Sequence, residues 1–205
     1  MHIYLVQHGA AVPKDENPEK PLSDSGRDDI KKMASFLARS HVSAARVIHS
    51  GKLRALETAL LLAEVLGPGN VVEEVESGLA PNDSTDALFA AIDGWTEDTI
   101  VVGHLPFMSK MVSRLVTGNE DETVVHFKPG SVARLERGEN GGGWTGTRFL
   151  RPDPAPESRG TRMRKRPGRV ARGVHRSAGE GAQRFFASSG VMVQCMSRSR
   201  PSFSP

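Results

Sequence analysis

His8 and His104 each lie at the end of a short apolar run, and both are side chains that could do chemistry. The run over residues 2–6 is followed by Gln7 and His8, and the run over residues 99–102 is followed by Gly103 and His104. Short runs rich in β-branched residues are typical of buried parallel strands. Because ligands bind beyond the carboxyl ends of such strands, we expect the two histidines to share one pocket. A neutral imidazole is a competent nucleophile, and a second imidazole can stabilise charge on an oxyanion.

Ser50 and Arg54 follow a third candidate strand. Arg54 falls in the first turn of a predicted helix over residues 53–66. A helix amino terminus attracts anions, and a guanidinium can bind phosphate oxygens through two parallel hydrogen bonds. Taken alone, Arg54 could equally be a solvated side chain paired with Asp28 or Glu57, and either histidine alone could have a structural role.

Apolar periodicity and turn residues predict strands that alternate with helices around these side chains. The expected strands cover 2–6, 47–49, 71–75, 99–102, 124–127, 131–136 and 144–150, and the expected helices 26–39, 53–66, 84–92 and 106–116. The predicted helix caps are Ser23 or Ser25 and Ser84, and residues 140–143 form a predicted turn. Strands alternating with helices form right-handed βαβ units. We therefore predict an α/β fold over residues 1–150, a three-layer α/β/α sandwich with a mostly parallel central sheet.

Charge divides the chain in two. Residues 1–150 carry 15 Lys and Arg against 21 Asp and Glu, a net charge of −6 that is ordinary for a globular domain. Residues 151–205 carry 12 against 3, a net charge of +9, and are rich in Arg, Gly and Ser. That composition predicts a basic, disordered C-terminal tail. Two alternatives are a basic arm that binds nucleic acid or an acidic surface, and an extension from a shifted or read-through reading frame.

Composition also argues against several classes of protein. The single cysteine, Cys195, leaves no internal disulfide and no cysteine-based metal cluster. No His, Asp and Glu spacing suggests a metal site, and no glycine-rich nucleotide-binding loop is present. No apolar run reaches the roughly 18 residues of a membrane-spanning helix, and the first strand begins without a signal-peptide pattern. The sequence predicts a cytoplasmic protein with neither metal nor cofactor.

Four segments occur in the order in which the histidine phosphatase superfamily, also called the phosphoglycerate mutase-like family, carries them. They are the first strand with His8-Gly9, then Pro21–Gly26, Ser50–Thr58 and Gly103–Pro106. Over about residues 1–150 the chain is therefore similar to this superfamily. Its short length, without a large insertion, resembles the SixA-type phosphohistidine phosphatase branch.

The resemblance implies a role for each matching residue. His8 would be the nucleophile that becomes phosphohistidine, and Arg54 and His104 would hold the phosphoryl group. The other phosphate-binding positions would be Gln7, Gly9, Lys20 and Ser50. Glycine at position 9 would let the backbone turn sharply and approach a ligand closely.

Gln7 and Lys20 depart from the family pattern. The family has arginine where this chain has Gln7, whose neutral hydrogen bonds are roughly half as strong as charge-assisted ones. Lys20 stands where the branch usually has arginine, so that it keeps the charge and loses bidentate geometry. Larger family members use a carboxylate as the general acid. Asp83 is the nearest candidate for it here, and it could equally cap the helix that starts near Ser84.

The resemblance implies a metal-independent phosphatase that hydrolyses phosphohistidine on a protein of a phosphorelay or phosphotransfer system. The expected partner is that phosphohistidine-containing protein. We expect no binding to a membrane, and any binding to nucleic acid would depend on the basic tail alone. Two alternatives stay open. One is a small-molecule phosphomonoesterase of the same superfamily, and the other is a catalytically weak protein that binds through its phosphate pocket, an alternative motivated by Gln7.

Overall fold

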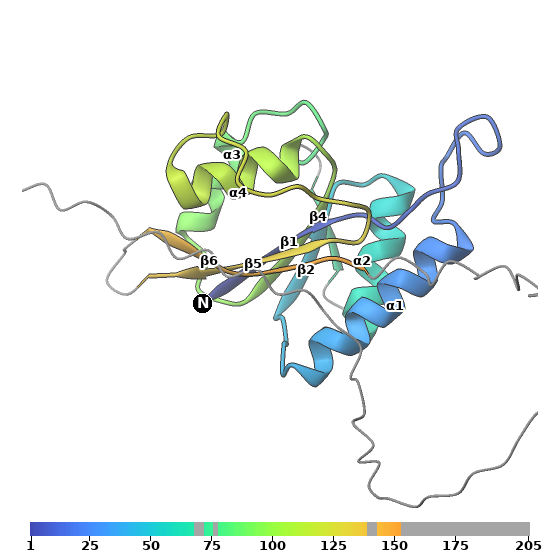
Figure 1. The fold of residues 1–205 in the computed structure, drawn as a ribbon, viewed down its shortest axis with the longest axis horizontal. Helices are drawn as coiled ribbons and strands as arrows, with labels where there is room; N and C mark the ends of the chain where they lie inside the picture. The colour runs from blue at the N-terminus through green and yellow to red at the C-terminus, as the bar shows by residue number, and fades with distance from the viewer. Residues whose placement is uncertain (68–71, 76–77, 139–142, 153–205) are drawn as a thin grey trace, which may run out of the picture. The chain divides into compact units, whose positions relative to one another are not determined.

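The computed structural model describes residues 1–67, 72–75, 78–138 and 143–152, which form one six-stranded sheet and four helices. The elements are, in chain order, β1 (His2–Gln7), α1 (Asp24–Arg39), β2 (Arg46–His49), α2 (Leu53–Leu66), β3 (Val72–Glu74), α3 (Asp86–Asp93), β4 (Thr99–Gly103), α4 (Phe107–Thr117), β5 (Val132–Arg137) and β6 (Trp144–Leu150). Figure 1 shows α1 and α2 on one side of the sheet and α3 and α4 on the other.

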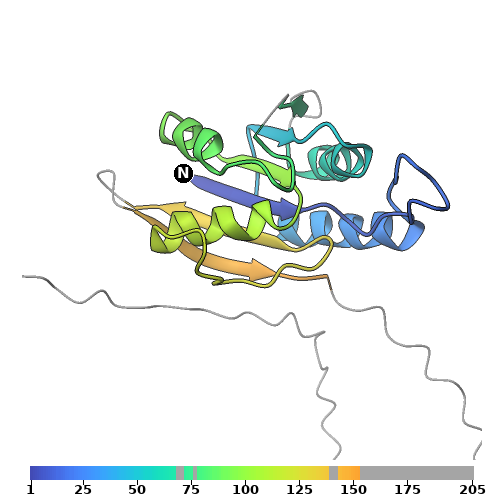
Figure 2. The same cartoon turned by 90° about the horizontal axis from the view of Figure 1, so that it is seen from above.

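The strand order across the sheet is β3-β2-β4-β1-β5-β6. Pairing is parallel from β3 through β2 and β4 to β1, and antiparallel for β5 and β6. Figure 2 shows the strands in this order from β2 to β6. The predicted α/β sandwich with a mostly parallel sheet is confirmed, and its two antiparallel strands share one edge.

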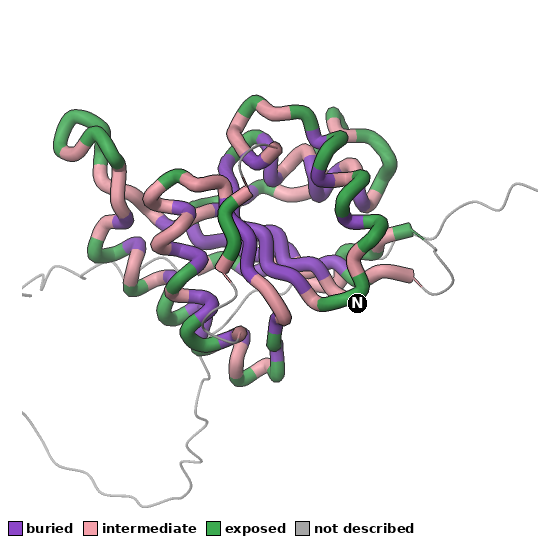
Figure 3. The backbone as a smooth tube through the Cα atoms, turned by 180° about the vertical axis from the view of Figure 1, so that it is seen from behind, coloured by how far each residue is buried: buried purple, intermediate pink, exposed green. Residues whose placement is uncertain are grey.

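Two apolar cores cover the two faces of the sheet. Alternate residues of β1 point to opposite faces, as the two-residue period of a strand requires. Tyr4 and Val6 pack with the residues of α1 and α2, whereas Ile3 and Leu5 pack with those of α3 and α4. Figure 3 shows the central strands as the buried part of the fold. The sheet is therefore the middle layer of three, and the carboxyl ends of its parallel strands open at one edge.

Helix α1 begins at the cap that the sequence predicted. The Ser23 hydroxyl accepts a hydrogen bond from the Gly26 N–H at 3.1 Å, which satisfies one of the free N–H groups of the first turn. Glycine is needed at position 26 because a Cβ there would lie 2.1 Å from the carbonyl oxygen of Ala10. The amino end of α1 thus packs directly against the loop that follows β1.

Two local predictions were wrong. Residues 124–127 form an irregular segment rather than a strand. The carbonyl of Val125 accepts a hydrogen bond from Ser109 on α4, and Phe127 packs edge-on against Phe149 of β6, so this segment uses its apolar side chains to cover the second core. Helix α3 begins at Asp86, with Thr85 rather than Ser84 at its N-cap position.

The remaining elements match their predicted ranges to within about two residues. Most of the predicted turn at 140–143 and nearly all of the predicted tail at 151–205 lie outside the described residues. None of the helices that the structure describes has the length and apolarity needed to cross a membrane.

Replacing Gly26 by alanine should destabilise the fold by about 2–3 kcal/mol, because the new Cβ meets the Ala10 backbone and can fit only if the loop or the helix moves. Gly94→Ala is the matched control, since its Cβ would lie 3.7 Å from its nearest neighbour in a helical backbone conformation. Urea unfolding of both variants measures the difference. A free energy of unfolding for Gly26→Ala within 0.5 kcal/mol of the wild type would contradict this packing.

Candidate active site

His8 and His104 meet where β1 and β4 end side by side. The parallel register pairs Gln7 with Gly103, and the N–H of His8 donates to the Gly103 carbonyl at 3.1 Å. The two imidazole rings, from strands far apart in the sequence, have centroids 4.9 Å apart. The strand pattern therefore predicted correctly that the two histidine side chains lie side by side.

The hydrogen bonds of His8 define its tautomer. Nδ1 lies 2.7 Å from the carbonyl oxygen of Gly9, which can only accept, so Nδ1 carries the proton. Nε2 accepts a hydrogen bond from Nε of Arg54 at 3.1 Å. The imidazole is thus neutral, and the lone pair of Nε2 lies on the side of the ring that faces Arg54.

Burial and nearby cations keep both histidines neutral. Burial lowers the pKa of His8 to about 4; the hydrogen bond to Gly9 acts in the opposite direction, and Arg54, Lys20 and Lys52 lower the pKa further. Burial also lowers the pKa of His104 to about 3, with further lowering by His8, Arg54 and Lys52. At neutral pH both rings are therefore uncharged, the state in which imidazole is nucleophilic.

Within the described part of the chain, Arg54 forms no ion pair with Asp28 or Glu57, the two partners considered from the sequence. Glu57, one turn along α2, pairs instead with Arg27 and accepts the Leu22 N–H, so it joins α2 to the start of α1. The carbonyl of Arg54 accepts from the Thr58 hydroxyl, which in turn accepts the N–H of Gly9 at 3.1 Å. The same segment of α2 thus positions both the guanidinium and the loop that carries His8.

Ser50 connects the β2–α2 turn to His104. Its hydroxyl lies 2.6 Å from Nε2 of His104, whose side chain is 2% exposed and whose Nδ1 has no partner among the described residues. Gly51 gives this turn its shape with a φ of 74°, and its N–H donates to Nδ1 of His49 at 3.1 Å. The His49 side chain therefore stabilises this turn through a hydrogen bond, and it does not line the described cleft.

Gln7 and Gly9 flank the nucleophile candidate in different ways. Gln7 is 8% exposed, and its Oε1 has no hydrogen-bond partner within the described part of the chain. Gly9 has no positive φ; it is needed because a Cβ would lie 2.9 Å from the side chain of Ile30 and 3.0 Å from that of Leu22. Glycine here is required for close packing against α1, rather than for the sharp turn that the sequence suggested.

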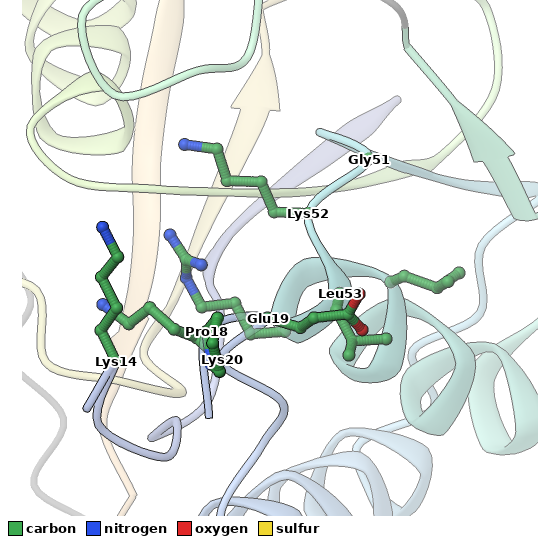
Figure 4. A pocket seen from close by; sticks show the side chains of 9 residues that line it. Lys14, Pro18, Glu19, Lys20, Gly51, Lys52 and Leu53 are labelled. Atoms are coloured by element: carbon green, nitrogen blue, oxygen red, sulfur yellow. The ribbon is translucent and has the colours of Figure 1, made fainter. Parts of the chain in front are cut away.

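Lys20 lines an open cleft of about 540 Å³ beside Arg54. Its backbone has a φ of 53°, a left-handed conformation that is uncommon for a residue with a side chain. Lys14 and Lys52 line the same cleft, as Figure 4 shows, and neither was singled out from the sequence. The sequence contains only a weak indication that these two lysines line the cleft: Lys52 lies two residues before Arg54, and Lys14 lies in the loop that carries Lys20.

Asp83 lies apart from this group of hydrogen bonds. Its carboxylate accepts the N–H groups of Gly78 and Ala80, both at 2.8 Å, and so closes its own loop instead of capping α3. No hydrogen bond among the described residues links it to His8, Arg54 or His104. Its role as a general acid stays a prediction.

Known proteins are similar to this chain in sequence and in fold. A profile of the histidine phosphatase superfamily (branch 1) matches residues 3–80, a span that contains His8, Lys20, Ser50 and Arg54. Phosphohistidine phosphatase SixA of Escherichia coli (strain K12) is 28% identical over 149 residues, which cover 70% of this chain and 89% of that protein. An uncharacterized protein of Picosynechococcus is 29% identical over 126 residues, covering 58% of this chain and 74% of that one.

The solved structure of the protein histidine phosphatase SixA complexed with tungstate has a TM-score of 0.65 and 26% identity, covering 74% of this chain and 97% of that one. The sequence match, the curated relative and the shared fold agree with the four motifs and their geometry. The family model, the curated relative and the solved structure therefore support a place for this chain in the histidine phosphatase superfamily, in its SixA-type branch.

Proposed function

We propose that this protein is a phosphatase that hydrolyses phosphohistidine on a protein substrate through a covalent phosphohistidine intermediate on His8. The observation that carries the proposal is the state of His8. Its Nδ1 is held by the Gly9 carbonyl, and its unprotonated Nε2 lies within 3.1 Å of the Arg54 guanidinium. A nucleophile and a phosphate-binding cation are therefore in contact before any substrate binds.

In the first step, Nε2 of His8 attacks the phosphorus of the substrate. The new P–N bond forms as the bond from phosphorus to the substrate imidazole breaks, and the departing nitrogen keeps the electron pair of that bond. When the other ring nitrogen of the substrate phosphohistidine is protonated, the ring leaves as neutral imidazole, so the step needs little help from a general acid. This suits a site in which the carboxylate of Asp83 is engaged by two backbone N–H groups.

In the second step, water attacks the phosphorus and the P–Nε2 bond breaks, which releases inorganic phosphate and returns His8 to its neutral form. Charge on the phosphoryl oxygens would be balanced by Arg54 and Lys20, with hydrogen bonds from His104 and Gln7. Ser50, 2.6 Å from His104, would fix the orientation of that ring. Gln7 would contribute a neutral donor where an arginine would contribute a charged one.

Two comparisons support this assignment. The Escherichia coli relative is named a phosphohistidine phosphatase, and the SixA structure holds tungstate, a tetrahedral oxyanion like phosphate. An oxyanion site is what the cations around His8 would provide in this chain. The metal-independent mechanism and the cytoplasmic location stay predictions.

His8→Ala should abolish formation of the phosphoenzyme and lower phosphate release from a phosphohistidine peptide by roughly a thousandfold or more, because no other group replaces the nucleophile. The matched control is His126→Ala, an exposed histidine outside the site. Labelled phosphate trapped at alkaline pH and mapped to a peptide containing residue 8 measures the intermediate.

Phosphate release by His8→Ala within tenfold of the wild type would show that His8 is not the nucleophile. A wild type that releases no phosphate above this variant, from phosphohistidine or from phosphate esters, would contradict the phosphatase assignment. Turnover of phosphate esters alone would favour the small-molecule phosphomonoesterase.

The pH at which His8 titrates should be far below that of an ordinary histidine. Burial and the nearby cations lower its pKa to about 4, so the ring stays neutral as the pH falls through 6.5 and gains a proton only near pH 4. NMR titration of the ring carbons, assigned with His8→Ala, measures the midpoint. Adding inorganic phosphate should raise it, since a bound anion favours the protonated ring; a midpoint near 6.5 without phosphate would contradict this environment.

A further inference from the structure

Three lysines line the cleft that Arg54 also lines, and they come from two separate segments. Lys14 and Lys20 lie in the loop between β1 and α1, and Lys52 is the N-cap residue of α2. The cleft of about 540 Å³ falls within the range of roughly 300–1,000 Å³ that is typical of ligand sites. It is therefore large enough for more than a single phosphoryl group.

The charges of these lysines are not balanced by neighbours. Among the residues that the structure describes, neither Lys14, Lys20 nor Lys52 forms an ion pair, whereas Lys32 and Lys110 each do. Glu19 also lines the cleft. In Figure 4 its carboxylate lies apart from the three ammonium groups, which extend to the same side of the cleft. The cleft thus offers three ammonium groups that form no ion pair with its one carboxylate.

The concentration of positive charge is unusual for this domain. Residues 1–150 carry a net charge of −6, with 15 basic and 21 acidic side chains, yet the cleft is lined by three lysines and Arg54 against a single glutamate. The lysines also act on the reaction centre, because Lys20 and Lys52 both contribute to the low pKa of His8. A substrate placed on His8 therefore lies within their field.

The loop that carries Lys14 and Lys20 is held in place rather than loosely attached. Ala11 and Leu22 form an antiparallel bridge at its base, and Val12 N–H donates to the Pro21 carbonyl at 2.8 Å. The left-handed backbone of Lys20 is kept by this closure, with its N–H on the Asn17 carbonyl at 3.0 Å. Strained conformations of this kind persist where surrounding structure fixes them, often at binding sites.

We propose that this cleft binds acidic side chains that flank the phosphohistidine of the protein substrate. The inference rests on the proposed function, and it adds Lys14 and Lys52 as residues that determine specificity. Arg54 and Lys20 suffice for one phosphoryl group, which leaves Lys14 and Lys52 for aspartates or glutamates beside it. Complementary charge of this kind raises the rate of encounter and selects among partners.

The test compares two phosphohistidine peptides of equal length, one with aspartate and glutamate beside the phosphorylated residue and one with asparagine and glutamine. The wild type should have a kcat/KM for the acidic peptide roughly fivefold to tenfold higher at low ionic strength, as expected for two or three exposed charge pairs. In 1 M salt the preference should disappear, since the Debye length falls to about 3 Å.

The double variant Lys14→Gln/Lys52→Gln should lower this ratio to about one. Lys31→Gln/Lys32→Gln is the matched control, because it removes two positive charges from exposed positions of α1 away from the cleft and should keep the wild-type ratio. The ratio within one enzyme, rather than an absolute rate, separates specificity from any general effect on folding.

Equal turnover of the two peptides by the wild type, or a preference that survives in the double variant, would overturn the inference and leave the proposed function intact. A ratio lowered equally by the control variant would also overturn it, since net charge rather than the cleft would then be responsible. Failure of the wild type to hydrolyse either peptide would contradict the proposed function and this inference together.

Discussion

Parallel pairing between β1 and β4 is the constraint on which the rest of the site depends. Gln7 and Gly103 are the last paired residues of the two strands, so both strands end at the same edge of the sheet. The hydrogen bond from the His8 N–H to the Gly103 carbonyl extends this pairing by one residue. Two histidines nearly a hundred residues apart are thereby fixed with their rings 4.9 Å apart. A slip of one residue would turn every side chain of β1 to the opposite face and separate them.

The helices on the α1 and α2 face supply the second half of the arrangement. Glu57 binds Arg27 and the Leu22 N–H, and Thr58 links the Arg54 carbonyl to the Gly9 N–H. Because Gly9 and Gly26 have no Cβ, the loop after β1 and the first turn of α1 can pack closely against each other. Because Glu57 is engaged by α1, the Arg54 guanidinium stays available for an anion.

Desolvation and positive charge act together on the two imidazoles. His104 is buried, His8 is partly buried, and both rings lie near cations, so both favour the neutral form and their pKa values fall to about 4 for His8 and about 3 for His104. The same cations that would bind a phosphoryl group thus keep the nucleophile unprotonated.

The sequence by itself determined the α/β class, most element boundaries and the resemblance to the histidine phosphatase superfamily, because the apolar periods and the four motifs are local in the chain. It also identified His8, Arg54 and His104 as a group. The tertiary structure alone decided three things: that Glu57 pairs with Arg27, that residues 124–127 cover a core instead of forming a strand, and that Lys14 and Lys52 face the same cleft as Lys20. Each depends on contacts between segments that are distant in the sequence. Local propensity does not indicate which distant segment a side chain will contact.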